Sequence, residues 1–312
     1  AAASGVLKRQ AMYDPEANFV YGVIARRRSR TVDAKEALGW AARSGEYRSA
    51  AYCQMAEIFL QEKDYESALE YGRRALDADM HSLNALEVMA TAYRKKGMSR
   101  EARETLEKIL ETDPLDNLAR FELYLLKPEN SSLKDFTSMI RCEIPHEVYL
   151  ETAMYYVRLG LTADAVAVLK NIPEHPTACY WLAYLLKDAS AEESQGYLEK
   201  ASGMSAWLVF PFREESIPVF EWAVSARPSD WKPKYYLGLI LWGKGRVDES
   251  LRLFESCRES DFAPFFLARG SLYQDRAPEK ARADFETAVR IDDKSWRNWH
   301  LLAGFLLRAG LT

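Results

Sequence analysis

Hydrophobic residues recur at helical spacing along most of this chain of 312 residues. In residues 49–78, a first apolar helix face has members at positions i, i+3, i+4 and i+7, and these are Tyr52, Met55, Ala56 and Phe59. Polar residues 62–64 interrupt the pattern, and a second apolar face then follows over 65–76. Two amphipathic helices joined by a short polar turn predict an antiparallel helical hairpin.

The same design returns 34 residues further along the chain. The matching pairs are Met55 and Met89, Ala56 and Ala90, Phe59 and Tyr93, Ala68 and Ala102, and Met80 and Pro114. A fixed period of this size is typical of stacked helical hairpins, in which each unit packs on its neighbours. Looser copies of the pattern precede these two units, beginning near Tyr21, and follow them as far as Leu306.

The segment 205–213 departs from this pattern. It has no helical period, and it contains Pro211. We expect an insertion or a distorted hairpin here, with its apolar side chains tucked into the seam between neighbouring helices. Those side chains are Trp207, Leu208, Val209, Phe210 and Phe212.

The two regular units resemble the tetratricopeptide repeat. The first helix has a large residue, then Ala at 56 or 90, then Phe59 or Tyr93, and Pro114 closes the second unit. The resemblance implies an all-α, right-handed superhelical solenoid of about eight to nine antiparallel helix hairpins. We divide the chain into a lead-in over 1–17, repeats over 18–204, an irregular aromatic segment over 205–230, and further repeats over 231–312.

A second resemblance rests on three strings, Leu208–Arg213, Trp231–Arg246 and Asp261–Arg269. They are similar to the carboxy-terminal repeat region of large bacterial proteins in which an uncharacterised sugar-mutarotase-like domain precedes the repeats. This implies that the chain is the helical tail of a longer protein, and the first residues, Ala-Ala-Ala-Ser-Gly without Met, agree with that. The family has no settled activity to carry over.

Composition narrows the classes of partner. Hydrophobic residues make up 48% of the chain, which is ample for a core, and the net charge is −4. Nucleic-acid-binding domains usually carry a basic excess, so we expect no nucleic-acid partner. The one basic run, 26–28 with Arg30, is interpreted as a solvated helix end, with a phosphate-binding patch as the alternative. No apolar run reaches the ~20 residues of a membrane span. We leave the compartment open and favour the cytoplasm.

Catalytic, metal and cofactor motifs are absent from the sequence. The four histidines lack the HxxxH or HExxH spacing, the four cysteines lack a CxxC pair, and there is no phosphate-binding loop and no GxSxG. Adjacent carboxylates such as Glu192 and Glu193 point in different directions on a helix, so they do not form an acid–base pair. We therefore predict no enzyme activity, no metal and no cofactor.

Binding is the stronger hypothesis, because the resemblance implies that first helices line a concave surface. The inward positions are polar and acidic early in the chain, at Asn84, Glu57 and Glu87 among others, and aromatic later. Glutamates would repel a terminal carboxylate, so we expect no carboxylate clamp of the kind found in chaperone-binding relatives. The candidate partner-binding residues are Phe121, Tyr180, Tyr184, Lys187, Lys232, Tyr235 and Trp242.

Two functions remain open on the sequence. The first is a non-catalytic scaffold that binds a protein or peptide partner on its concave face, with the aromatic residues as apolar anchors. The alternative is a carbohydrate-associated module that serves a sugar-acting domain. The competing structural interpretation is that each of these aromatic residues packs within or between repeats.

Overall fold

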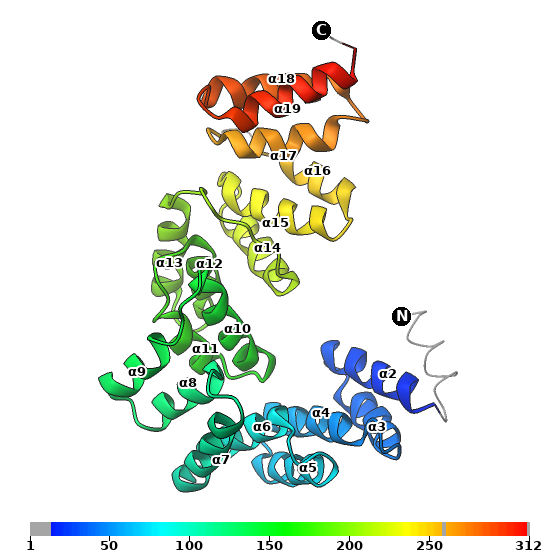
Figure 1. Cartoon of the computed structure of the whole chain (residues 1–312), viewed down its shortest axis with the longest axis vertical. Coiled ribbons are helices and arrows are strands. Elements are labelled where there is room, and N and C mark those ends of the chain that lie inside the picture. Colours follow the sequence, from blue (N-terminus) through cyan, green and yellow to red (C-terminus); the bar gives the residue numbers. More distant parts are fainter. Residues whose placement is uncertain (1–13, 258–259, 311–312) are drawn as a thin grey trace. The chain divides into compact units, whose positions relative to one another are not determined.

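The computed structural model describes residues 14–257 and 260–310, and across these ranges the fold is entirely helical (Figure 1). It has eighteen α-helices and one short 3-10 helix, and no strand occurs in the described ranges. The prediction of an all-α array of helical hairpins is confirmed. Most of the lead-in predicted over 1–17 lies outside the described residues, and the first helix already begins at Pro15.

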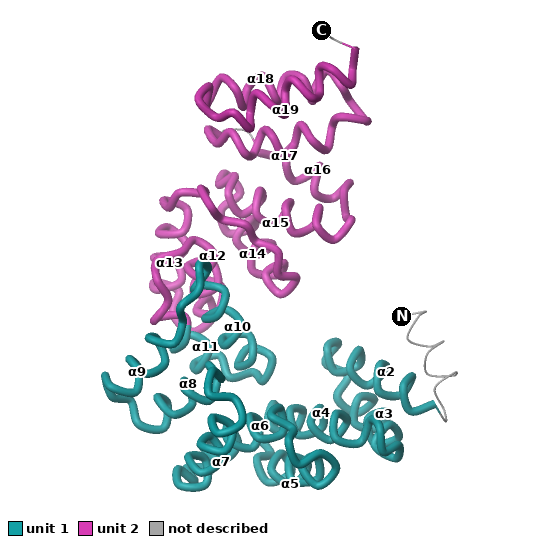
Figure 2. Tube along the Cα trace, in the orientation of Figure 1, with its two compact units in different colours: residues 1–168 teal, residues 169–312 magenta. Residues whose placement is uncertain are grey.

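The chain divides into two compact units, residues 1–168 and 169–312 (Figure 2). The helices of the first unit are α2 (Pro15–Arg27), α3 (Thr31–Ala41), α4 (Arg48–Gln61), α5 (Tyr65–Ala78), α6 (Leu83–Lys95), α7 (Ser99–Thr112), α8 (Asn117–Leu126), α9 (Asn130–Thr137) and α10 (Pro145–Arg158). Helix α11 (Thr162–Leu169) ends at the division between the units. The second unit has α12 (Pro176–Leu186), α13 (Ala191–Gly203), the 3-10 helix η1 (Glu214–Ser216), α14 (Ile217–Ala226), α15 (Trp231–Gly243), α16 (Val247–Glu255), α17 (Ala263–Tyr273), α18 (Pro278–Ile291) and α19 (Trp296–Arg308).

Consecutive helices pack on each other as hairpins. The packed pairs are α2 with α3, α4 with α5, α6 with α7, α8 with α9, α12 with α13, α15 with α16, and α17 with α18. In the first unit, α4 also packs against α2 and α6, so the first helices of successive hairpins form a continuous layer. The same regions of sequence that show apolar helical faces therefore supply the contacts between helices.

The turn inside each hairpin fixes the 34-residue period more clearly than the side-chain pattern does. Ser29, Lys63 and Gly97, each 34 residues apart, follow the first helices of three successive hairpins and have φ values of 56°, 64° and 77°. This left-handed conformation costs little for glycine but is unfavourable for other residues. The turn geometry thus extends the regular period one unit upstream, where the side-chain pattern is degenerate.

Small residues permit close helix contact. A Cβ atom built on Gly238 of α15 would lie 2.2 Å from Cε1 of Phe254 on α16, and Phe254 is fully buried. On α15 the Gly238 carbonyl also accepts a hydrogen bond from the buried Ser250 hydroxyl at 2.8 Å. The α15–α16 hairpin therefore depends on the absence of a side chain at position 238.

The prediction for the apolar residues of segment 205–213 was wrong for four of five. Only Val209 is buried, whereas the exposed fractions of the other four side chains lie between 57% and 70%; these are Trp207, Leu208, Phe210 and Phe212. Helix α14 packs directly on both α12 and α15. Because helix contacts already fill the seam, the segment crosses it without inserting most of its side chains.

Replacing Gly238 with Ala should destabilise the second unit. The added methyl group overlaps the Phe254 ring, and overpacking of this kind costs about 1–3 kcal/mol. Urea denaturation would measure the loss. The matched control is Gly196→Ala in the middle of α13, where a Cβ atom meets nothing within 4 Å, and there alanine should raise stability by about 0.5–1 kcal/mol. Equal effects of the two substitutions would show that contact with Phe254 is not limiting.

Candidate functional site

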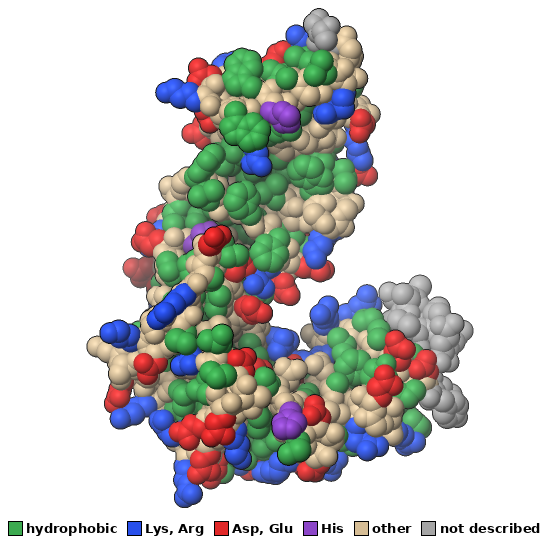
Figure 3. All heavy atoms as spheres, in the orientation of Figure 1, with side chains coloured by type: hydrophobic (Ala, Val, Ile, Leu, Met, Phe, Trp, Pro, Cys, Tyr) green, Lys and Arg blue, Asp and Glu red, His purple; other side chains and the backbone are tan. Residues whose placement is uncertain are grey.

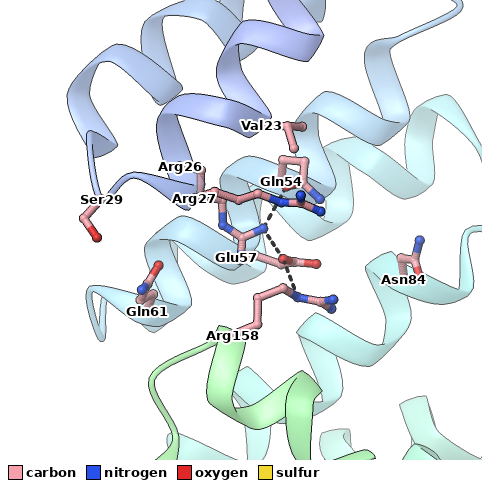
Figure 4. A pocket seen from close by; sticks show the side chains of 9 residues that line it. All are labelled: Val23, Arg26, Arg27, Ser29, Gln54, Glu57, Gln61, Asn84 and Arg158. Carbon is pink, nitrogen blue, oxygen red and sulfur yellow. Dashed lines mark hydrogen bonds and ion pairs between the residues drawn. The ribbon is translucent and has the colours of Figure 1, made fainter. Parts of the chain in front are cut away.

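A polar cavity of about 410 Å³ lies in the first unit (Figure 4). Its lining comes from α2, α4 and α6, from the last residue of α10, and from Ser29 just after α2. The lining residues are Val23, Arg26, Arg27, Ser29, Gln54, Glu57, Gln61, Asn84 and Arg158. Helices α2, α4 and α6 are the first members of their hairpins, so the cavity opens on the layer that these first helices form.

Glu57 connects two arginines across this cavity. Its Oε2 atom pairs with Nη1 of Arg26, and it lies 3.3 Å from Nε of Arg158. Figure 4 shows the two arginines reaching the carboxylate from opposite sides. Nη1 of Arg26 also donates a hydrogen bond to Oε1 of Gln54 at 2.7 Å. The ion pairs hold both guanidinium groups in place at the cavity wall.

One donor of Arg26 has no acceptor. The Arg26 side chain is only 7% exposed, and its Nη2 atom is buried without a hydrogen-bond partner among the residues described. A buried donor left unsatisfied costs about 1–3 kcal/mol. The position beside this atom is therefore one where an oxygen from a bound molecule would be stabilised.

The cavity is basic, and the prediction that the early groove is acidic needs correction. Glu57 is inward, as expected, but Arg26 and Arg27 from α2 and Arg158 from α10 surround it. The basic run 26–28 is the signal in the sequence, and its interpretation as a solvated helix end is wrong for Arg26. Arg26 is instead almost completely buried, because α4 packs against α2 and covers it.

Glu87 of α6 lies near the cavity, and its charge is largely suppressed at neutral pH. Burial raises the pKa of Glu87 to about 8, with further contributions from the nearby Asp116 and Glu57, while Arg158 opposes them. Burial also raises the pKa of Asp116. Protonated at pH 7, Glu87 does not cancel the positive charge of the arginines.

A buried network fixes the helix that carries Arg158. The carboxylate of Glu122 on α8 is 1% exposed and accepts hydrogen bonds from Nε and Nη2 of Arg94 on α6, at 2.6 and 2.8 Å, and from the Tyr156 hydroxyl on α10, at 2.8 Å. Nη2 of Arg94 also lies 3.0 Å from Asp164. Burial by itself would lower the pKa of Arg94, but its bonds to Glu122 and the two carboxylate charges outweigh burial and raise it. Arg158 lies on the same helix, half a turn beyond Tyr156. By holding Tyr156, the network therefore also fixes the position of Arg158.

Three of the predicted partner-binding residues belong to the core instead. Phe121, Tyr180 and Tyr235 are at most 5% exposed. Phe121 packs edge-on against Phe136 with ring centroids 5.1 Å apart, and the Tyr180 hydroxyl donates to Asp230 at 3.2 Å. These three residues pack within or between repeats, as the competing interpretation predicts, because large aromatic rings fill the space between layers of helices.

The other four predicted residues lie partly exposed in the second unit. Nζ of Lys187 sits 3.9 Å from the centre of the Tyr184 ring, so these two residues are brought together. Lys232 donates to the backbone carbonyl groups of Ser202 and Met204. Trp242 lines a separate cavity of about 460 Å³ together with Trp207, Leu267 and Leu301. Figure 3 shows hydrophobic side chains gathered over this part of the second unit.

Residues 14–257 and 260–310 contain no group of three or more His, Cys, Asp or Glu side chains placed to hold a metal ion. Within the same ranges, no helix has the length and apolar character required to cross a membrane. The four cysteines are all free.

Two family models, each described as tetratricopeptide repeat, match parts of the chain. One covers residues 59–121, and the other covers 22–82 and 212–264. Residues 22–121 and 212–264 match tetratricopeptide repeats. Of the helices that line the polar cavity, the matches include α4, α6 and residues 22–27 of α2, but not α10. Neither match describes a sugar-mutarotase-like domain, so that resemblance stays a prediction.

Solved structures with helical repeats are similar over most of the chain at low identity. A tetratricopeptide repeat protein from Parabacteroides merdae is 16% identical, with 94% of this chain and 98% of that chain covered and a TM-score of 0.33. A chain of the Cut9–Hcn1 hetero-tetramer of APC/C is 14% identical. The match covers 98% of this chain and 59% of that chain, with a TM-score of 0.37. YrrB, a protein of the same repeat type with an unusual peptide-binding site, is 18% identical, with 86% and 98% covered and a TM-score of 0.27. No curated protein matches the chain.

Breaking the buried pair between Arg94 and Glu122 should strongly destabilise the first unit. Arg94→Leu leaves the Glu122 carboxylate buried without its cation, which costs about 3–5 kcal/mol. Glu122→Leu should also destabilise, and the double variant should lose less than the two single losses combined, because it leaves no unpaired charge from this pair. Urea denaturation of wild type, the two single variants and the double variant gives the coupling free energy between Arg94 and Glu122. The control is Arg100→Leu, which removes an exposed ion pair with Glu104 and should cost less than about 1 kcal/mol. Strict additivity in the cycle would contradict the assignment.

Glu87→Gln should stabilise the protein more at pH 8 than at pH 5. The pKa of Glu87 is higher in the folded state, at about 8, than the 4.5 of a free glutamate, so the folded state holds a proton that the unfolded state releases in this window. Stability from this residue is therefore lost as the pH rises from about 4.5 to about 8. Glutamine does not ionise, so its advantage over glutamate should grow by at least about 1 kcal/mol between pH 5 and pH 8. Urea denaturation of wild type and Glu87→Gln at pH 5 and pH 8 measures this difference in free energy of unfolding. The same difference at both pH values would contradict the raised pKa.

Proposed function

We propose that this chain is a non-catalytic interaction scaffold that binds a segment of a partner protein against the first helices of its first unit. Tetratricopeptide repeats typically serve as protein-interaction scaffolds, and this arrangement agrees with that use. The cavity takes side chains from α2, α4 and α6, the first helices of three successive hairpins, and from the end of α10, so a bound segment would contact several repeats at once. Such contact is favourable because rigid helices hold the donors in place before binding.

The observation that carries this proposal is the unsatisfied donor of Arg26. Its Nη2 atom is buried at the cavity without an acceptor in the described chain. A carboxylate or another oxyanion of the partner would provide a charge-assisted hydrogen bond, which is stronger than a bond between neutral groups. The amide groups of Gln54, Gln61 and Asn84 stand in the same lining and can bond to the backbone of an extended peptide.

The second unit offers surface for apolar side chains of a partner. Trp207, Phe210 and Phe212 are exposed, and Trp242 lines the cavity beside Trp207. Exposed apolar groups gathered in one region mark interaction sites more often than isolated ones do. We propose Tyr184, Lys187 and Trp242 as contact residues of this second surface.

Selection from a random peptide library displayed on phage, with the full chain as target, tests the proposal. Peptides rich in Asp and Glu should be enriched, and Arg158→Gln should weaken their binding at least tenfold, which corresponds to about 1.4 kcal/mol, by fluorescence polarisation. Arg158 is half-exposed, so the substitution should leave the fold intact.

Arg100→Gln on α7 is the matched control, because it removes an exposed arginine from a second helix, and it should leave the affinity unchanged. Failure to enrich any peptide would contradict the scaffold function. Enriched peptides that bind wild type and Arg158→Gln equally would contradict the polar cavity as the binding site.

A further inference from the structure

The charge of the polar cavity exceeds what a single carboxylate would neutralise. Its lining holds the guanidinium groups of Arg26, Arg27 and Arg158 but one carboxylate, that of Glu57, so two positive charges remain unbalanced. Glu87, which interacts electrostatically with Glu57 and Arg158, has a pKa that burial raises to about 8, so it adds little negative charge at neutral pH. A phosphate monoester carries a charge of about −1.5 to −2 at pH 7, whereas a peptide carboxylate carries one negative charge.

The donors also approach the cavity from several directions. Arg26 and Arg27 come from α2, the amides of Gln54 and Gln61 from α4, and Arg158 from the end of α10 (Figure 4). A carboxylate presents two oxygens in one plane. A phosphoryl group presents three acceptor oxygens around a tetrahedral centre, so it can bond donors that converge from different helices.

The buried donor of Arg26 requires an acceptor at the cavity wall. Glu57 Oε2 forms ion pairs with Arg26 and Arg158 but, like Nη2 of Arg26, has no hydrogen-bond partner in the described structure. An oxygen placed there would satisfy Nη2 while its neighbours face Arg158 and the exposed Arg27. The three arginines could then share one ligand without breaking the pairs that Glu57 makes.

The lining also indicates which phosphorylated side chain fits. Val23 is the one aliphatic residue among the nine that line the cavity. The ring of a phosphotyrosine would require apolar walls, whereas the short stems of phosphoserine and phosphothreonine do not. A volume of about 410 Å³ accommodates such a side chain together with adjacent backbone.

We infer that the polar cavity of the first unit binds the phosphoryl group of a phosphorylated serine or threonine in the partner protein. This inference rests on the proposed function, since it specifies the chemistry of the segment that the scaffold binds. Binding would then depend on modification of the partner, with the phosphoryl oxygens bonded by Arg26, Arg27 and Arg158.

The test uses three degenerate peptide libraries that differ only at one fixed central position, which holds phosphothreonine, threonine or glutamate. Fluorescence polarisation with the full chain should show the phosphothreonine library binding at least tenfold more tightly than the other two. Arg27→Gln and Arg158→Gln should each reduce that affinity at least tenfold, while Arg100→Gln should not change it. Circular dichroism spectra and melting temperatures like those of wild type would show that the variants are folded.

The outcomes separate this inference from the function on which it rests. Equal binding of the phosphothreonine and glutamate libraries, still sensitive to Arg158→Gln, would overturn the phosphoryl assignment and leave an acidic-peptide scaffold. Phosphothreonine binding that neither arginine variant affects would overturn the cavity as its site. Competition by inorganic phosphate at the same concentration as the peptides would overturn a phosphorylated protein as the ligand in favour of a free phosphate compound.

Discussion

The first unit depends on a single buried carboxylate. Glu122 is 1% exposed, and moving a charge of this kind out of water costs several kcal/mol unless charged partners and hydrogen bonds compensate. Arg94, Tyr156 and Thr91 provide those bonds from α6 and α10 to α8. Because the carboxylate is stable only when these donors converge, the network specifies how three successive hairpins align, more narrowly than apolar contacts alone would.

The binding surface is a consequence of that alignment. Tyr156 ties α10 to the network, and Arg158, at the end of the same helix, meets Glu57 of α4 across the cavity. Residues about a hundred positions apart in sequence thus share one ion-pair system. The cavity also contains an unsatisfied Arg26 donor and the partly buried, protonated Glu87, both unfavourable for folding in isolation. Groups that reduce stability commonly gather at functional sites, and here they surround a basic cavity lined by first helices.

Much of the architecture could be predicted from hydrophobic spacing. The faces containing Met55, Ala56 and Met89 are buried helix faces, and the turn residues Ser29, Lys63 and Gly97 repeat at the predicted period. The site could be predicted only in part. The sequence predicts Glu57 as inward, but it gives no signal for the burial of Arg26 or for the position of Arg158, since each depends on which helix lies opposite. The aromatic prediction failed at Phe121, Tyr180 and Tyr235 for the same reason, because an inward helix face can be covered by the neighbouring repeat.

The sequence by itself determined that this protein is an array of helical hairpins, because the period of apolar residues and the small residues at helix contacts are local properties of the chain. Tertiary structure alone decided which polar side chains meet. The pairing of Arg26 with Glu57, the convergence on Glu122 and the exposure of Trp207 and Phe210 all depend on contacts between elements distant in sequence. Burial and charge pairing are set by those contacts, and no periodicity along the chain encodes them.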